Sequence, residues 1–396
     1  MAQMNKASRK GNPLWTVRVD RQESFLGRAI LAAILDGEAG RLVRRSWGAV
    51  IRPTNNLDAL RLLSALAVIV GHSFTLTGLG AAPRVLGIPI HSLGLYAFFA
   101  ISGYLIATSW AHNPALVPFL VNRTLRIFPA LVIVVMVTVV LIGPVVSSLA
   151  PAQYFRDEMV YQYLLNLVLT AQYELPGVFD AGHRSTAVNG VLWTLGLEFV
   201  CYLVVAVIGL LLRTRSSWGY LVFGLIALTF ALVPVASPAL AWAGPAGTTW
   251  VFFAVGALLS RAPARSLNLR LAIGVVTLWV AITLLAPTVS LAAAWLALPY
   301  VLVVAGRAST PGVRRAARFG DLSYGLYLWG FLVQQLVIDW FGILPWSMNI
   351  AIVTATTAAI AALSWHLVEK RALSHKIHRV TTRPPGDPRT VSAVPV

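Results

Sequence analysis

The chain has 396 residues, of which 58% are hydrophobic and only 11% are charged. Soluble proteins have about 45–50% apolar and about 25% charged residues, so this composition excludes a soluble globular protein. The formal net charge of +17 would suit a nucleic-acid partner, but that interpretation depends on where the basic residues lie.

Ten mostly apolar segments follow one another along the chain, and a membrane-spanning helix needs about 20 such residues. Their expected limits are 57–78, 91–110, 127–149, 190–212, 218–236, 247–260, 270–287, 290–306, 321–340 and 347–368. The sequence therefore predicts an all-α integral membrane protein with about ten transmembrane helices. We expect a basic N-terminal tail (1–56), a ten-helix membrane domain (57–369) and a basic, disordered C-terminal tail (370–396).

The basic residues lie almost entirely on one predicted side of the membrane. Ten crossings put both ends on that side, which then holds 28 of the 31 Lys and Arg residues. The short loops alone divide 11 to 3 in the same direction. Because basic loops favour the cytoplasm, both termini are expected to be cytoplasmic and the loop 150–189 to be outside. The positive charge then reflects topology, and no nucleic-acid partner is expected.

The cysteine content limits the redox and metal chemistry. Cys201 is the single cysteine, which excludes an intrachain disulfide and a cysteine-based metal site. No metal ion is expected. The sequence also contains neither an internal repeat of the transporter kind nor a nucleotide-binding glycine loop.

The first apolar segment carries three ionisable residues, Asp58, Arg61 and His72. A charge at the bilayer centre costs about 2.5–3.5 kcal/mol, so such residues are functional candidates. Arg61 and His72 are separated by three helical turns plus about 20°, with a rise of about 16 Å, and Asp58 lies near the same stripe. The stripe favours a polar cavity. The alternatives are an interfacial Asp58–Arg61 ion pair and a hydrogen-bonded core histidine.

Arg123 and Arg126 are spaced i,i+3 where the third segment begins. Two guanidinium groups at a cytoplasmic mouth suit phosphate groups, because each can donate two hydrogen bonds to one anion. The alternative is that both residues only orient the helix by their positive charge.

Glu198 lies in the fourth segment at a depth comparable to that of His72. A carboxylate that faces a histidine fixes its tautomer and stabilises its imidazolium form, which suits a general base. Alternatively, Glu198 braces Trp193 or Tyr202, or carries protons in a transporter.

Five segments in this order resemble acyltransferase family 3, a family of integral membrane proteins that transfer acyl groups to sugars and other acceptors. They are LDALRLLSALAVIVGH (57–72), FFAISGYLI (98–106), FLVNRTLRIFP (119–129), VLWTLGLEFVCYL (191–203) and DLSYGLYLW (321–329). The resemblance covers about residues 55–370 and implies ten core helices with cytoplasmic termini, as the charge distribution does independently.

The resemblance also implies roles for individual residues. His72 matches the essential histidine of the family, Arg61 the upstream arginine, and Arg123 and Arg126 the pair associated with acyl-CoA use. The remaining matches are Trp193 and Glu198 in the fourth segment and Ser323, Tyr324 and Tyr327 in the ninth.

The sequence departs from the family pattern at two places. Gly330 stands where many members have a histidine, and Lys370 and Arg371 follow Glu369 where proline is frequent. Neither departure affects the assignment of His72.

These resemblances imply an acyl-CoA-dependent O-acyltransferase in the bacterial inner (plasma) membrane. The donor, expected to be acetyl-CoA, acts as a substrate, and no permanently bound cofactor is expected. The expected acceptor is a surface polysaccharide or glycolipid whose hydroxyl is activated by His72. The competing hypothesis is a transporter or flippase that uses the same polar residues as a proton relay or headgroup site.

Overall fold

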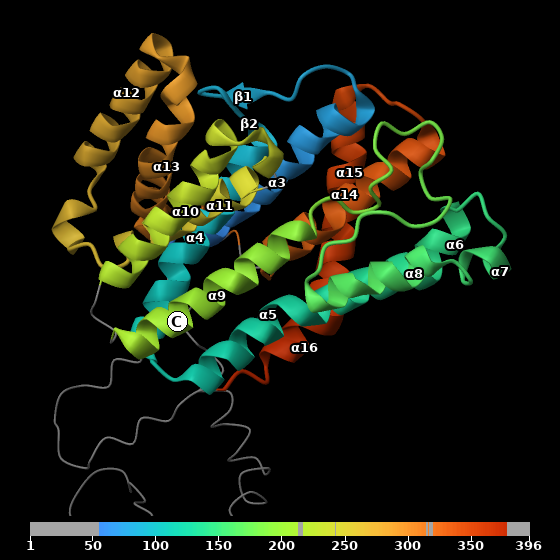
Figure 1. The fold of residues 1–396 in the computed structure, drawn as a ribbon, viewed down its shortest axis with the longest axis horizontal. Coiled ribbons are helices and arrows are strands. Elements are labelled where there is room, and N and C mark those ends of the chain that lie inside the picture. The colour runs from blue at the N-terminus through green and yellow to red at the C-terminus, as the bar shows by residue number, and fades with distance from the viewer. Residues whose placement is uncertain (1–54, 213–216, 242, 314–315, 317–319, 378–396) are drawn as a thin grey trace, which may run out of the picture. The chain divides into compact units, whose positions relative to one another are not determined.

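The computed structural model describes residues 55–212, 217–241, 243–313, 316 and 320–377; most of the predicted tails, 1–54 and 378–396, lies outside these ranges. Its α-helices are α3 (Leu57–Thr77), α4 (Ile90–His112), α5 (Leu116–Val137), α6 (Gly143–Val146), α7 (Pro151–Tyr154), α8 (Glu158–Tyr163), α9 (Trp193–Leu211), α10 (Trp218–Ala236), α11 (Ala243–Leu259), α12 (Leu269–Leu285), α13 (Ser290–Arg307), α14 (Leu322–Phe341), α15 (Trp346–Ser364) and α16 (Lys370–Leu373) (Figure 1). Two short strands, β1 (Arg84–Val85) and β2 (Ile88–Pro89), pair antiparallel between α3 and α4.

Within the described residues, seven helical segments are long and apolar enough to cross a membrane. They are Leu57–Thr77, Ile90–His112, Leu116–Val146, Trp193–Leu211, Trp218–Val235, Pro287–Arg307 and Trp346–Leu373. The shorter apolar helices α11 and α12 and the helix α14 coincide with the other three expected segments. The all-α membrane class is thus confirmed, whereas ten crossings and cytoplasmic termini stay predictions.

Helix α14 is enclosed by protein, which explains why it can be less apolar than a helix that faces lipid. Its residues from Ser323 to Ile338 are all buried, and it packs against α3 and α15. Polar side chains within a membrane face the bundle interior, where protein groups satisfy them. Gln335 does this by donating to the carbonyl groups of Ser185 and Ala187, each at 2.8 Å.

Glycines let α4 pack closely between α3 and α11. A Cβ atom at Gly94 would lie 2.5 Å from the carbonyl oxygen of Ser64 on α3, and one at Gly256 on α11 would lie 2.1 Å from that of Ala100 on α4. Both distances are too short for any other residue. Small residues at such crossings allow the backbone contacts that hold membrane helices together.

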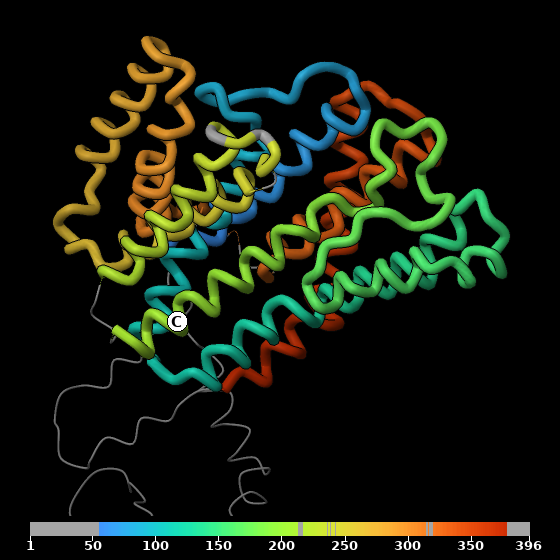
Figure 2. Tube along the Cα trace, viewed as in Figure 1, coloured from blue at the N-terminus to red at the C-terminus, as the bar shows by residue number. Residues whose placement is uncertain are grey.

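The third span changes its winding near its C-terminal end. Helix α5 contains Pro129 and continues through a π-helical turn, Thr138–Ile142, into α6, without a break in the trace of Figure 2. The hydroxyl of Tyr154 on α7 donates to the carbonyl of Val139 in this turn, at 3.1 Å. A side chain from the following loop therefore satisfies one carbonyl group of this turn.

The loop between α6 and α9 contains α7, α8 and a 3-10 turn (Leu164–Val168), and then an extended stretch. This stretch is tied to the bundle: Asn189 donates to the carbonyl of Leu328 at 2.9 Å, and His183 lies against Gln335 and Asp339 of α14. The loop thus covers the half of α14 that follows Leu328.

The last span is longer than predicted. Helix α15 continues through a π-helical turn, Trp365–Glu369, into α16, which ends at Leu373. The side chain of Asn122 then forms two hydrogen bonds with the backbone of Ile377, of 3.2 and 2.9 Å. The expected disordered tail from 370 is therefore wrong for residues 370–373, which are helical, and for Ile377, which Asn122 holds.

Candidate functional site

A pocket lies between α3, α4, α5, α9 and α14 and encloses about 490 Å³ of empty space, open solvent included. Ligand sites typically have a mostly apolar lining with a few polar groups. Its lining residues are Arg61, Leu95, Phe98, Phe99, Ser102, Arg126, Ile127, Thr194, Leu195, Glu198, Tyr324 and Tyr327. Five of the ten residues proposed from the sequence therefore share one cavity.

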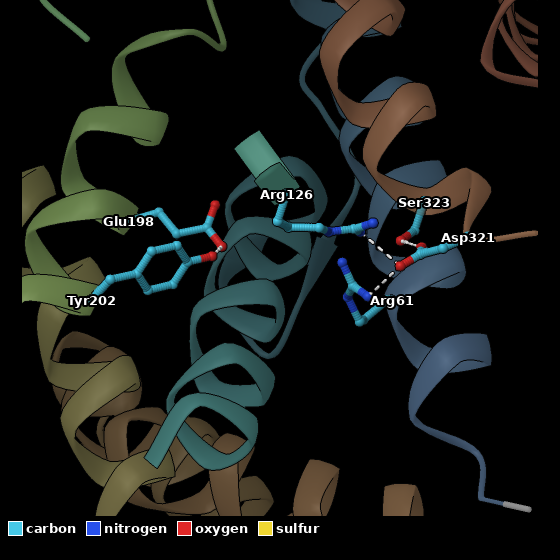
Figure 3. A network of polar contacts seen from close by, with 6 residues as sticks. All are labelled: Arg61, Arg126, Glu198, Tyr202, Asp321 and Ser323. Carbon is cyan, nitrogen blue, oxygen red and sulfur yellow. Dashed lines mark hydrogen bonds and ion pairs between the residues drawn. The ribbon is translucent and has the colours of Figure 1, made fainter. Parts of the chain in front are cut away.

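Asp321, directly before α14, joins two of the lining arginines. One carboxylate oxygen accepts from Arg61 at 2.8 Å and from Arg126 at 2.6 Å, while the other accepts from the Ser323 hydroxyl at 2.7 Å (Figure 3). All three charged side chains are 15–17% exposed. Burial alone would raise the pKa of Asp321, but Arg126, Arg61 and the Ser323 hydroxyl outweigh it and hold that pKa below its usual range. The carboxylate is therefore charged at neutral pH and fixes both guanidinium groups.

Arg123 and Arg126, which were predicted to share an anion site, lie against different aromatic rings in the structure. The guanidinium of Arg126 lies in the pocket, 5.2 Å from the centre of the Tyr324 ring. That of Arg123 lies between the rings of Phe119 and Tyr202, at 5.8 and 6.0 Å. The structure thus pairs Arg126 with Arg61, from a different helix, and places Arg123 outside the pocket lining.

Glu198 enters the pocket from α9 and accepts a hydrogen bond from the hydroxyl of Tyr202, one turn further along the helix (Figure 3). This contact corresponds to the alternative in which Glu198 braces Tyr202. The carboxyl group lines the cavity that also holds Arg61 and Arg126. It therefore belongs to the same site as the arginines.

His72 lies outside this pocket lining, near the other end of α3. Its ring stacks on His91 of α4, with centroids 5.2 Å apart, and meets the edge of Phe331 of α14 at 5.1 Å. Gly71 makes room for this arrangement, since a Cβ atom there would lie 2.5 Å from that of His91. The described ring contacts of His72 are thus aromatic, and Glu198 is not among its described partners.

The other proposed residues take different positions. Tyr324 and Tyr327 line the pocket, and Ser323 supports Asp321. Asp58 lies in the first turn of α3, and Trp193 begins α9; neither lines the pocket. A group of three or more His, Cys, Asp or Glu residues that could hold a metal ion does not occur within the described ranges.

Two residues of the site, Asp321 and His91, were not predicted from the sequence. Asp321 opens the DLSYGLYLW segment, and a carboxylate at the boundary of an apolar segment was the available signal. Its partners are 260 and 195 positions away in the chain, so the contacts themselves could not be read from spacing. His91 had the same signal, because it is the ionisable residue that begins the expected segment 91–110.

Comparison with known proteins identifies relatives over most of the chain. Residues 54–368 match a family described as an acyltransferase domain. An O-acetyl transferase of Shigella phage Sf6 is 28% identical over 332 residues, which cover 81% of this chain and 96% of the relative. Nodulation protein 10 of Rhizobium leguminosarum bv. viciae is 31% identical over 371 residues, covering 83% and 96%. No solved structure matches the chain.

Proposed function

The chain belongs to acyltransferase family 3 and is a membrane O-acyltransferase; from that premise we propose that it transfers acetyl from cytosolic acetyl-CoA to a hydroxyl of a carbohydrate acceptor. The observation that carries the proposal is the pocket that Arg61, Arg126 and Glu198 line together. Arg61 lies on the same helix as His72, so this helix connects the pocket with the proposed base. The name of the phage relative supports acetyl as the transferred group.

The donor is proposed to bind with its phosphate groups at Arg61 and Arg126. Each guanidinium has five N–H groups in a planar fork, and one N–H of each bonds to Asp321. Asp321 therefore aims the two groups without using all their donors. The positive-inside distribution of the basic residues supports a cytoplasmic opening on this side, which is where acyl-CoA is available.

His72 is proposed as the general base that takes the proton of the acceptor hydroxyl. The hydroxyl oxygen then forms a bond to the thioester carbon, the carbon–sulfur bond breaks, and the proton passes from His72 to the CoA thiolate. The products are the acetyl ester and CoA, so atoms and charge balance. Such a base contributes about 10²–10⁴-fold in rate. Direct transfer is favoured over an acyl-enzyme because no activated serine or cysteine nucleophile accompanies His72 among the described residues; Cys201 is fully buried.

Glu198 is proposed to act in the donor pocket. Since it bonds to Tyr202 and lines the cavity with the arginines, it is available to a donor that reaches the pocket. Its contribution is thus to donor binding and to the charge balance of the cavity.

The test is acetyl-CoA turnover by the purified protein in detergent, supplied with glycan and glycolipid extracts of the producing cells. Wild-type protein should release CoA and transfer labelled acetyl, and His72→Ala should lose both by at least 100-fold while it remains folded. Mass spectrometry of surface glycans, with and without the gene, identifies the acceptor. Failure of the wild type to bind or use acetyl-CoA would overturn the donor, and wild-type turnover by His72→Ala would overturn the base.

A further inference from the structure

Two tyrosine hydroxyl groups in the pocket have already used their protons. The hydroxyl of Tyr324 donates to the backbone carbonyl of Ile127, at 2.8 Å. A hydroxyl has one hydrogen and two lone pairs. What Tyr324 can offer to a ligand is therefore an acceptor.

The same holds for Tyr327, by elimination. Its hydroxyl lies 2.7 Å from that of Thr194, and Thr194 donates its single hydrogen to the carbonyl of Val191, at 2.9 Å. Tyr327 must then be the donor in the contact with Thr194. Its remaining lone pairs make it an acceptor for a ligand in the pocket.

The arginines, the two tyrosines and Glu198 are consequently divided by chemistry; the other polar lining residues, Ser102 and Thr194, carry hydroxyl groups. Arg61 and Arg126 can only donate hydrogen bonds, whereas Tyr324 and Tyr327 present acceptors and an ionised Glu198 can only accept. Buried acceptors lose free energy unless a donor reaches them. The pocket therefore suits a ligand that has an anionic group at one end and N–H or O–H donors beyond it.

The order of these groups along α14 gives the ligand a direction. Asp321, with the arginines, precedes Tyr324, which is followed by Tyr327 and then by Phe331 beside His72. Tyr324 and Tyr327 are three residues apart, a rise of about 4.5 Å along the helix. The arm of acyl-CoA has the matching order of phosphate, amide, amide and thioester, and four bonds separate its two amide nitrogens, about 5 Å when extended.

We propose that the hydroxyl oxygens of Tyr324 and Tyr327 accept hydrogen bonds from the two amide N–H groups of the pantetheine arm. Tyr324 accepts from the amide nearer the phosphate, and Tyr327 accepts from the amide nearer the thioester. This inference rests on the proposed acyl-CoA donor and adds the two residues that set the position of its thioester relative to His72.

The experiment measures competition of S-acetyl-4′-phosphopantetheine with labelled acetyl-CoA for the purified protein. Two analogues are compared with it, each with one amide N–H replaced by an ester oxygen, which keeps the length but removes the donor. Wild-type protein should bind each ester analogue about 3- to 10-fold more weakly, the range of one net hydrogen bond. Tyr327→Phe should bind the parent more weakly and no longer distinguish it from the ester nearer the thioester, while still distinguishing the other; Tyr324→Phe should show the reverse.

Tyr163→Phe is the matched control, because Tyr163 is a buried tyrosine on α8 outside the pocket lining; it should behave as wild type with all three ligands. If wild-type protein binds acetyl-CoA and treats amide and ester analogues alike, the inference is wrong and the proposed function stands. The inference is also wrong if either Phe variant keeps the discrimination that it should lose. If wild-type protein does not bind acetyl-CoA, the donor itself is wrong. The wild-type comparison needs no variant, so it decides even if a Phe variant fails to fold.

Discussion

Asp321→Asn tests the arrangement on which the donor site depends. The substitution keeps the size of the side chain but removes the charge that holds Arg61 at 2.8 Å and Arg126 at 2.6 Å. Two guanidinium groups then face each other across a neutral amide. Removing one partner of a buried ion pair costs about 3–5 kcal/mol. Because the three side chains are 15–17% exposed, we expect a cost at the lower end of this range, about 3 kcal/mol.

The assay is thermal unfolding in detergent, together with acetyl-CoA binding. A loss of about 3 kcal/mol should lower the unfolding midpoint by about 5 °C, and acetyl-CoA should bind more weakly because the arginines lose their orientation. The control is Asp180→Asn, an exposed carboxylate in the outer loop, which should leave both values unchanged. Wild-type stability in the Asp321→Asn variant would refute the reasoning.

The pH dependence of folding stability provides a second test of the Asp321→Asn substitution. The pKa of Asp321 is held below its usual range: burial opposes this, but Arg126 and Arg61 outweigh burial. A carboxyl group with a lowered pKa stabilises the fold fully above its unfolded pKa of about 3.9 and loses that contribution as the pH falls through the folded pKa. The stability difference between wild type and Asp321→Asn should therefore be constant near pH 7 and shrink below about pH 4.

Three further substitutions test other described contacts. Arg126→Lys should weaken acetyl-CoA binding by about 1–3 kcal/mol, because lysine lacks the planar fork. Arg123→Lys should leave the affinity measured by calorimetry unchanged, since Arg123 lies outside the pocket lining. Equal effects of the two substitutions would argue against different roles for the two arginines. Gly256→Ala should lower the stability of the fold by about 3 kcal/mol and reduce the folded yield on size exclusion, because the new Cβ would lie 2.1 Å from a carbonyl oxygen. Gly274→Ala should change neither value, because open space surrounds Gly274. His183→Ala should destabilise the loop between α6 and α9 by about 1–3 kcal/mol and speed tryptic cleavage after Arg184. Unchanged cleavage would show that His183 does not hold this loop.

The helices could be predicted because a membrane helix is encoded in a local run of apolar residues. Helix α14 was predicted in the same way, as segment 321–340, although its run is weaker because protein encloses it. The last apolar segment was predicted to end at 368, before the charged residues Lys370 and Arg371, although the helix continues to Leu373. Charge marks where the lipid ends and gives no information on where a helix ends.

The site could be predicted as a set of residues but not as a set of contacts. His72 lies five residues before the end of α3 and Glu198 five residues after the start of α9, and their comparable depth in the membrane stays a prediction. Depth does not fix the direction in which a side chain points. Direction depends on how each helix is rotated against its neighbours, and that rotation results from packing between segments far apart in sequence. Tyr202, one helical turn from Glu198, became its partner, and His91 and Phe331 surround His72.

The distance between the donor pocket and His72 is bridged by side chains. On α3, Arg61, Val68 and His72 are spaced by seven and four residues and so share one face. Val68 belongs to a buried cluster with Tyr327 and Phe331 of α14, and Tyr327 lines the pocket while Phe331 contacts His72. In the proposed mechanism, an acyl group that reaches His72 from the arginines passes the side chains of Val68 and Phe331 in this cluster. Because the cluster is buried, water that enters the pocket meets the same side chains before it reaches His72.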